Sequence, residues 1–294
     1  MGGDSKYLGL AYVAPYALGL LLFTAFPFLS SLYLSFTDYD LLSSPEWVGL
    51  DNYERLFTRD RTFDKSLRVT LTYVAMTVPL KLVFALFIAV VLNYRLKGIN
   101  LFRTAYYVPS ILGGSIAIAV LWRYIFAGDG LMNMILMAVG IEPINWFGDP
   151  ENALFTITLL RLWQFGSAMV IFLAALQSVD KSLYEAAAID GAGPWQMFRN
   201  ITLPLITPVI FFNLIMQTVH AFQEFNGPYI ITQGGPLKST YLLPLYIYDE
   251  AFKDFDMGYA SAISWVLFAI IMVLTLLAFW SSKKWVYYAG DERN

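Results

Sequence analysis

The chain has 294 residues, of which 58% are hydrophobic and 14% are charged, and its formal net charge is -3. So few charges cannot cover the surface of a soluble protein of this length, and the composition therefore predicts an integral membrane protein. The sequence has no cysteine and one histidine, His220, which excludes disulfides, iron-sulfur ligation, thiol nucleophiles and zinc sites that need several His or Cys ligands.

Six apolar stretches are long enough to cross a bilayer as helices, which takes about 20 residues each. The first contains Pro15 and Pro27 and is too long for the apolar region of a cleaved signal peptide. We therefore predict an all-α, polytopic membrane protein with six transmembrane helices in a single domain, residues 1–294. The expected spans are Tyr7–Phe36, Leu67–Asn93, Phe102–Phe126, Ala153–Leu176, Leu205–Glu224 and Tyr259–Ser281.

The charges of the connections predict the orientation, because basic connections are retained in the cytoplasm. The connection between the second and third spans is basic, and the connections at 37–66, 127–152 and 226–257 are each net acidic. The deciding residues are Arg95, Lys97 and Arg103 on the basic side, and Asp129, Glu142, Asp149 and Glu151 in the connection between the third and fourth spans. Both termini are thus expected in the cytoplasm, and the acidic outer connections are either solvated loops or a docking surface.

A short, partly charged segment separates the fourth and fifth spans on the cytoplasmic side. It reads EAAAIDGAGPWQMFRNITLPLITP over residues 185–208. Ser182 and Glu185 match a capping box and Gly191 suits a left-handed helix end, which predicts a helix from Leu183 to Asp190. Pro194 suits the first turn of a second helix. Such a bracket of two helices with apolar side chains either binds a partner or lies on lipid headgroups.

The segment resembles the EAA loop of the inner-membrane permeases of ATP-binding-cassette (ABC) importers. The matching residues are Glu185-Ala186-Ala187, Gly191 and the later Ile201-Thr-Leu203-Pro204. The extended form EAAAIDGAGPWQMF, with TQGGP at 232–236 and FDMGYASA at 255–262, is similar to the carbohydrate-uptake branch, which includes permeases for maltose, other oligosaccharides, alginate and glycerol phosphate. The resemblance covers nearly the whole chain.

This resemblance implies a multi-pass permease subunit of the cell inner membrane that forms half of a translocation path for a sugar, oligosaccharide or polysaccharide. The cytoplasmic segment 180–204, here called the bracket, would couple to an ATPase. The implied ATPase-coupling residues are Glu185, Ala186, Ala187, Asp190, Gly191 and Trp195. The implied partners are a second, related permease subunit, two cytoplasmic ATP-binding-cassette subunits and an extracytoplasmic solute-binding protein, besides lipid and the saccharide. No nucleic acid is expected.

The sequence offers no phosphate-binding loop of its own. The stretch GGPLKST at 234–240 has Leu237 before the lysine, where the motif needs glycine, and it lies outside the predicted spans without a preceding strand. We therefore expect a non-catalytic transport subunit without a cofactor in this chain, while ATP and Mg²⁺ belong to the partner ATPase.

Polar side chains deep in a span are costly and usually face an interior, so they mark candidate contacts for the solute. On the fifth span, polar residues recur at steps of four, three and four and share one face; the last of them, Glu224, is expected near the outer end, in reach of water. Together with the fourth span and the family resemblance, this predicts the solute-binding residues Trp163, Gln164, Ser167, Asn213, Met216, Gln217 and His220. Asn213 and Gln217 also fit interhelical hydrogen bonds, and His220 also fits a packing role.

Three basic residues lie in or near the spans. Lys81 follows Pro79 in the middle of the second span, and we expect it to satisfy the backbone carbonyl that the proline leaves free. Arg123 and Arg161 are expected near the outer interface, where long side chains reach water. If one of these cations faces the path, an acidic saccharide is favoured.

Other classes fit less well. An ion-coupled secondary carrier for a small polar solute remains the alternative, but Glu224 is the only acid near a span. An intramembrane protease lacks a nucleophile motif and paired aspartates, and a structural scaffold would not need the bracket. The identity, charge and length of the saccharide, and whether the two permease chains are identical, stay open.

Overall fold

The computed structural model describes residues 4–94 and 98–287. Arg95 and Lys97, on which the predicted orientation partly rests, lie outside the described residues. The described chain is mostly helical, as predicted, and divides into two compact units. The first unit comprises Met1–Asp64 and Tyr246–Ala269, and the second comprises Lys65–Leu245 and Ile270–Asn294.

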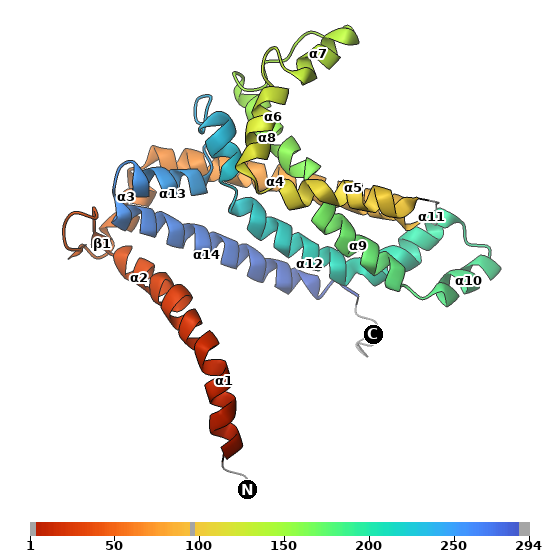
Figure 1. The fold of residues 1–294 in the computed structure, drawn as a ribbon, viewed down its shortest axis with the longest axis horizontal. Helices are drawn as coiled ribbons and strands as arrows, with labels where there is room; N and C mark the ends of the chain where they lie inside the picture. The colour runs from red at the N-terminus through yellow and green to blue at the C-terminus, as the bar shows by residue number, and fades with distance from the viewer. Residues whose placement is uncertain (1–3, 95–97, 288–294) are drawn as a thin grey trace. The chain divides into compact units, whose positions relative to one another are not determined.

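The first unit begins with a long apolar helix in three pieces, coloured red in Figure 1. These are α1 (Asp4–Leu20), a π-helical turn (Leu21–Ala25) and α2 (Phe26–Leu34). A two-stranded antiparallel sheet follows, in which Thr37 of β1 (Thr37–Asp38) pairs with Trp47 of β2 (Glu46–Trp47). The unit is completed by α3 (Asp51–Thr58), the start of α4 (Arg61–Asn93), most of α13 (Leu243–Phe252) and the first half of α14 (Met257–Ser282).

A glycine allows α14 to begin directly against β1. The Gly258 amide donates to the carbonyl of Tyr39 at 3.1 Å, and a Cβ on Gly258 would lie 2.1 Å from the carbonyl oxygen of Thr37. Only glycine fits such a close approach of two backbones. The FDMGYASA stretch thus has a packing role at this position.

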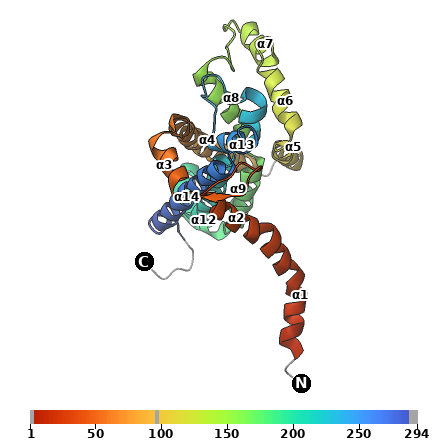
Figure 2. The same cartoon turned by 90° about the vertical axis from the view of Figure 1, so that its left-hand side faces the viewer.

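The second unit contains the remaining helices. They are α5 (Ile99–Leu112), α6 (Ile116–Ile125), α7 (Leu131–Ala138), α8 (Pro150–Trp163), α9 (Gly166–Ser178), α10 (Lys181–Ile189), α11 (Pro194–Met197) and α12 (Leu203–Phe222), with π-helical turns at Phe198–Thr202 and Pro228–Thr232. Its core is built by α4, α8, α9 and α12, where residues such as Ala85, Phe172 and Ile206 are buried. In Figures 1 and 2, α6 and α7 project away from α9 and α12.

The number of spans is four to six. Four helices are long and apolar enough to cross a membrane: Tyr12–Leu34, Arg61–Asn93, Pro194–Phe222 and Met257–Ser282. The predicted third and fourth spans are each broken, between α5 and α6 by 104° and between α8 and α9 by 44°. Two glycines precede Ser115, whose hydroxyl accepts from the Ala117 amide and caps α6, so the sequence starts a new helix there.

The helix that contains the predicted fifth span is longer than that span, because it is continuous from Pro194 to Phe222. Pro204 has no amide hydrogen and would interrupt regular α-helical bonding. The chain avoids a break by a π-helical turn at Phe198–Thr202, after which the Leu203 amide bonds the carbonyl of Phe198. The same device precedes Pro27, where the Phe26 amide bonds the carbonyl of Leu21. The bracket is therefore joined to α12 without a hinge.

Candidate functional site

Polar side chains from three helices of the second unit surround a small cavity, here called the polar cavity. Its volume is about 20 Å³, roughly the room that one water molecule needs. The lining residues are Tyr73, Thr77, Val78 and Lys81 of α4, Arg161 of α8, and Gln217, His220 and Ala221 of α12. The apolar packing of α4, α8 and α12 around Ile157 and Ile206 brings these side chains together.

A buried ion pair lies beside the polar cavity. Nε and Nη2 of Arg161 contact Oε2 of Glu224, whose side chain is 1% exposed. The other carboxylate oxygen of Glu224 accepts from the Gly227 amide at 2.9 Å. The expectation that Glu224 reaches water is therefore wrong, whereas the Arg161 side chain is 28% exposed. Each charge compensates the other. Removing one partner would therefore leave the other charge uncompensated.

The predicted residues at the junction of α8 and α9 have different contacts. Both ends of the Gln164 amide are engaged, since Oε1 accepts from Arg161 Nη1 at 2.9 Å and Nε2 donates to the Gly113 carbonyl at 3.0 Å. The backbone amide of Ser167 donates a hydrogen bond to Ser110 Oγ at 3.0 Å. Trp163 is 36% exposed, with its ring 5.9 Å from that of Trp122. None of these three side chains lines the polar cavity.

Only some of the residues predicted on α12 lie together at the polar cavity. Gln217 and His220 line the polar cavity, whereas Met216 is exposed on another face of the helix. Asn213 lies one turn before Gln217 and is fully buried, yet neither atom of its amide has a hydrogen-bond partner among the described residues. A buried amide without a partner costs folding free energy, so a water, a ligand or another chain is expected to complete it.

Tyr73 and Thr77 of α4 are not among the residues predicted for the site. With Lys81 they recur at steps of four and share a face, which is the pattern that was read on the fifth span. Lys81 itself is 8% exposed. Across residues 4–94 and 98–287, the structure records no hydrogen bond or ion pair of Lys81, and so none to the carbonyl that Pro79 leaves free. The predicted structural role of Lys81 is not observed.

The bracket has the two helices that were predicted, with a different start. Asp180 is the N-cap of α10 and accepts from the Ser182 amide at 2.9 Å, so the capping box at Ser182 is wrong by two residues. Aspartate at this place satisfies a free amide and carries charge that suits a helix N-terminus, and the hydrogen bonds to Ser182 lower the pKa of Asp180. Gly191 ends the turn with φ +80°, as predicted, and Pro194 begins α11.

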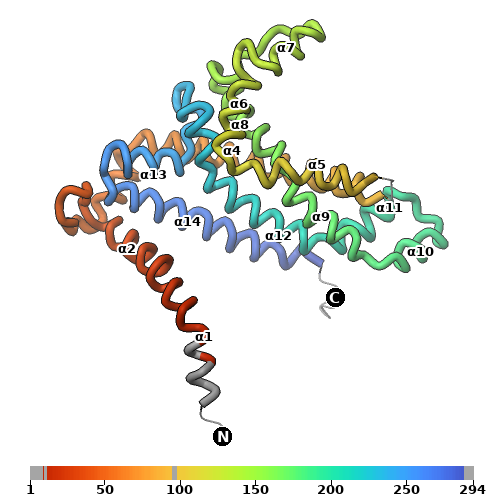
Figure 3. The backbone as a smooth tube through the Cα atoms, viewed as in Figure 1, coloured from red at the N-terminus to blue at the C-terminus, as the bar shows by residue number. Residues whose placement is uncertain are grey.

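The bracket presents apolar side chains at the surface. Its backbone lies beyond the ends of α9 and α12 in Figure 3. Ile189 is 88% exposed and Trp195 is 70% exposed, and the Trp195 ring stacks on Phe198 at 5.7 Å. Tyr184 anchors α10 to the second helix through a 2.8 Å hydrogen bond with Thr202. Among the predicted coupling residues, Ala187 is half-buried, and the exposed ones are Glu185, Ala186, Asp190, Gly191 and Trp195.

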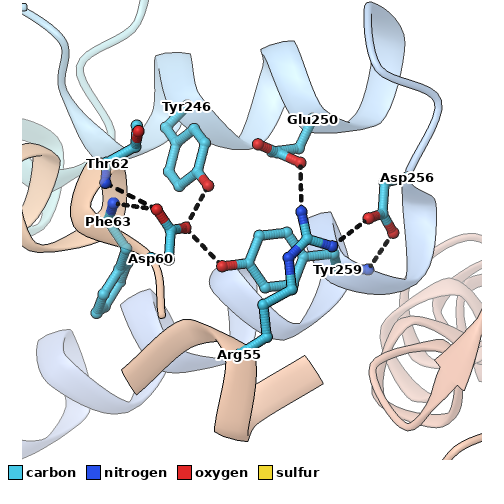
Figure 4. A network of polar contacts seen from close by, with 8 residues as sticks. All are labelled: Arg55, Asp60, Thr62, Phe63, Tyr246, Glu250, Asp256 and Tyr259. Atoms are coloured by element: carbon cyan, nitrogen blue, oxygen red, sulfur yellow. Dashed lines mark hydrogen bonds and ion pairs between the residues drawn. The ribbon is translucent and has the colours of Figure 1, made fainter. Parts of the chain in front are cut away.

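The first unit holds a contrasting polar network, which we call the Arg55 network (Figure 4). Arg55 contacts Asp256 at 2.7 Å and Glu250 at 3.8 Å, and its guanidinium lies 3.7 Å from the centre of the Tyr259 ring. Asp60 accepts hydrogen bonds from the hydroxyls of Tyr246 and Tyr259. Its other oxygen accepts from the amides of Thr62 and Phe63, so this carboxylate caps the start of α4.

The pKa values of two carboxyl groups in this network, Asp60 and Glu250, are shifted in opposite directions. Burial alone would raise the pKa of Asp60, but the hydrogen bonds from Tyr246, Tyr259 and two backbone amides outweigh it and lower that pKa. Burial raises the pKa of Glu250, against the opposing effects of Tyr246 and Arg55. Burial and the hydrogen bond to Asp60 raise the pKa of Tyr246, which stays a donor. The Arg55 network is thus a set of matched donors and acceptors.

Comparisons with known proteins place the chain in a family. Residues 56–285 match the family of the binding-protein-dependent transport system inner membrane component. The chain is 51% identical to a probable ABC transporter permease protein, YesP, of Bacillus subtilis over 97% of this chain and 93% of that protein. It is 36% identical to the lactose transport system permease protein LacF of Rhizobium radiobacter over 94% of each.

A solved structure has the same fold. It is a crystal structure of a bacterial ABC transporter involved in the import of the acidic polysaccharide alginate, with a TM-score of 0.84, 23% identity and 96% of each chain covered. The predictions of a permease and of a membrane location are confirmed, and the ion-coupled carrier is not supported. This chain belongs to the family of inner-membrane components of binding-protein-dependent transport systems.

Proposed function

We propose that this chain is one of two permease subunits of an ABC importer that takes up a sugar, oligosaccharide or polysaccharide. The family supports a binding-protein-dependent importer, and the lactose permease relative supports a saccharide as the solute. The extracytoplasmic solute-binding protein follows from the family description. The second permease, a related chain, and two cytoplasmic ATPase subunits complete the assembly. Residues 1–294 act together as one permease domain.

The observation that carries the proposal is the built and exposed bracket. Its turn depends on the left-handed Gly191, and its two helices are tied by the Tyr184–Thr202 hydrogen bond. Ile189 and Trp195 nevertheless stay in solvent, which is costly unless a partner covers them. We assign that partner as the ATPase, with Glu185, Ala186, Ala187, Asp190, Gly191 and Trp195 as coupling residues. This chain carries no cofactor, and ATP with Mg²⁺ binds the ATPase.

The orientation follows from this assignment. The bracket and both termini lie in the cytoplasm, and each bent helix pair counts as one span, which gives six. Because α11 continues into α12 through a π-helical turn, movement of the bracket is transmitted to α12 without a flexible joint. ATP-driven movement of the ATPase pair would then bias the permease between inward-open and outward-open states.

The solute contacts are proposed along α12 and the neighbouring helices. Asn213, Gln217 and His220 are the strongest members, since the Asn213 amide is buried without a partner and the other two line the polar cavity. Trp163 offers an exposed ring face, and Met216 and Ser167 complete the predicted set. Gln164 contributes by holding Arg161, because both ends of its amide are already bonded.

Two variants of the bracket test the proposal. Glu185→Ala and Gly191→Pro should abolish uptake in proteoliposomes that contain the whole importer, and should weaken ATPase binding in a pull-down. Pro at residue 191 cannot adopt the left-handed φ, and Glu185 is exposed, so its loss spares the helix bundle. Glu142→Ala removes an exposed glutamate in the predicted outer connection and is the matched control. Normal uptake by both bracket variants would refute the coupling assignment.

A further inference from the structure

Two predicted spans of the second unit are broken, and they differ in what covers the break. Between α8 and α9, Gln164 is 4% exposed and Phe165 is 5% exposed. Between α5 and α6, where the chain bends by 104°, Gly114 and Ser115 are exposed. The chain therefore encloses one break within itself and leaves the other open.

The open break comprises residues 113–115, here called the glycine turn, in the middle of the predicted third span. The Gly113 carbonyl accepts from Gln164 at 3.0 Å, whereas the Gly114 carbonyl receives a long hydrogen bond of 3.4 Å from Asn226. Because the hydrocarbon core of a bilayer holds no water, non-helical backbone at this depth is tolerated only where it is buried in protein or lines a water-filled cavity. The glycine turn therefore borders either water or another chain, and not lipid.

Two polar side chains at the glycine turn have hydrogen-bonding capacity that this chain does not use. Ser115 Oγ accepts from the Ala117 amide at 3.2 Å, and across residues 4–94 and 98–287 its hydrogen has no acceptor. The half-buried Asn226 donates to Gly114, but its amide oxygen accepts no hydrogen bond from the same part of the chain. A hydroxyl group both donates and accepts, so a molecule rich in hydroxyls can complete both side chains. These groups favour water and a sugar over an apolar helix of another chain.

We propose that the glycine turn and Asn226 line a water-filled part of the solute path, where Ser115 and Asn226 bind hydroxyl groups of the saccharide. The Ser115 hydroxyl donates to a sugar oxygen, and the amide oxygen of Asn226 accepts from a sugar hydroxyl. This inference rests on the proposed function, and it adds two solute contacts to those predicted on α12. Neither contact needs a charge on the sugar, so both suit neutral and acidic saccharides alike.

Thiol labelling tests the water-filled path, because the chain has no cysteine of its own. A Cβ on Gly114 meets nothing within 4 Å, so Gly114→Cys fits the turn. In the assembled importer in nanodiscs, this variant should react with a charged, membrane-impermeant methanethiosulfonate, and the mass of the chain reads the reaction. Gly19→Cys is the matched control, because its Cβ also meets nothing within 4 Å but lies in the continuous apolar helix Tyr12–Leu34, where it should not react. No reaction of Gly114→Cys, or equal reaction of the two variants, would overturn the path.

Uptake tests the solute contact, with lactose, maltotriose and trigalacturonate as the probes. Asn226→Ala should raise the KM for whichever of them is transported by about fivefold, the scale of one neutral hydrogen bond, and leave the maximal rate unchanged. Asn100→Ala, which loses a hydrogen bond of the same 3.4 Å length at the start of α5, should change neither. An unchanged KM in Asn226→Ala would overturn the contact. If none of the three saccharides is taken up, the proposed function fails and the saccharide contact with it, whereas a reactive Gly114→Cys would still show a water-filled path.

Discussion

The Arg55 network of the first unit and the polar cavity of the second are built from the same kinds of residue and differ in how fully those residues are paired. In the Arg55 network, Asp60 accepts four hydrogen bonds and Arg55 meets two carboxylates and an aromatic ring. At the polar cavity, Lys81 is buried and has no hydrogen bond or ion pair among the residues described. One turn before Gln217, the buried amide of Asn213 also has no hydrogen-bond partner among them.

This difference separates a structural role from a binding role. A satisfied network contributes to stability and leaves nothing for a ligand, whereas unpaired buried groups cost free energy and persist where another molecule completes them. Arg161 and Glu224 lie at the boundary, since they are satisfied and yet adjoin the cavity.

The largest effect is expected from breaking the buried ion pair. Glu224→Ala leaves the Arg161 guanidinium without its counter-charge and removes the acceptor for the Gly227 amide. Losing one partner of a buried pair costs about 3–5 kcal/mol, and the partial exposure of Arg161 places the loss near the lower end, about 3 kcal/mol. Thermal unfolding of the purified chain in detergent measures it.

The double variant Arg161→Leu/Glu224→Leu is the control, because it removes both charges together. It should recover most of the stability that Glu224→Ala loses, since no charge is left buried and unpaired. A double variant as unstable as the single one would mean that the pair is held by its other contacts, with Gln164 and Gly227, rather than by charge compensation.

Smaller changes in stability, of opposite sign to each other, are expected from replacing two buried side-chain amides. Asn213→Leu removes an amide with no partner and should stabilise the chain by about 1 kcal/mol, whereas Gln164→Leu breaks two hydrogen bonds and should destabilise it by about 1 kcal/mol. Detergent unfolding compares the two variants, and uptake by the reconstituted importer should fall in Asn213→Leu. Destabilisation by Asn213→Leu would show that its amide is already satisfied.

Local signals in the sequence predicted the bracket well. Gly191 and Pro194 set their turn and helix start through their own backbone preferences, and the structure agrees at both positions. The helix start was misplaced because Ser182 and Asp180 both suit an N-cap, and a pattern cannot tell which one the chain uses. Likewise, Pro204 was read as a boundary, since a π-helical turn that bypasses a proline leaves no compositional mark.

The pairing of charges could not be predicted, because it depends on which helices pack together. Arg161 and Glu224 are 63 residues apart, and each alone resembles an interfacial residue. The face of α4 with Tyr73, Thr77 and Lys81 carries a periodic signal that was available in the sequence. What the sequence lacks is the partner of each polar group, and that is what divides the Arg55 network from the polar cavity.

The smallest effect concerns the pH dependence of the Arg55 network. The pKa of Asp60 is lowered in the folded chain, so its contribution to stability is present above the unfolded pKa of about 3.9 and is lost as the pH falls through the folded value. The pKa of Glu250 is raised, so its contribution is present below the unfolded pKa of about 4.3 and is lost as the pH rises through the folded value.

Asp60→Asn should therefore flatten the loss of stability at acid pH, and Glu250→Gln should flatten the loss of stability as the pH rises. We expect a change of about 1 kcal/mol or less in each case, the size of one hydrogen bond. Unfolding in detergent between about pH 3 and about pH 7 measures both variants against wild type. Opposite changes in the pH dependence of stability would mean that the network keeps Asp60 charged and allows Glu250 to be protonated. Keeping Asp60 charged requires fixed hydrogen-bond donors around it. If both variants changed the pH dependence in the same direction, the hydrogen bonds of Tyr246 and Tyr259 would not be fixed on Asp60, and the contrast with the polar cavity would fail.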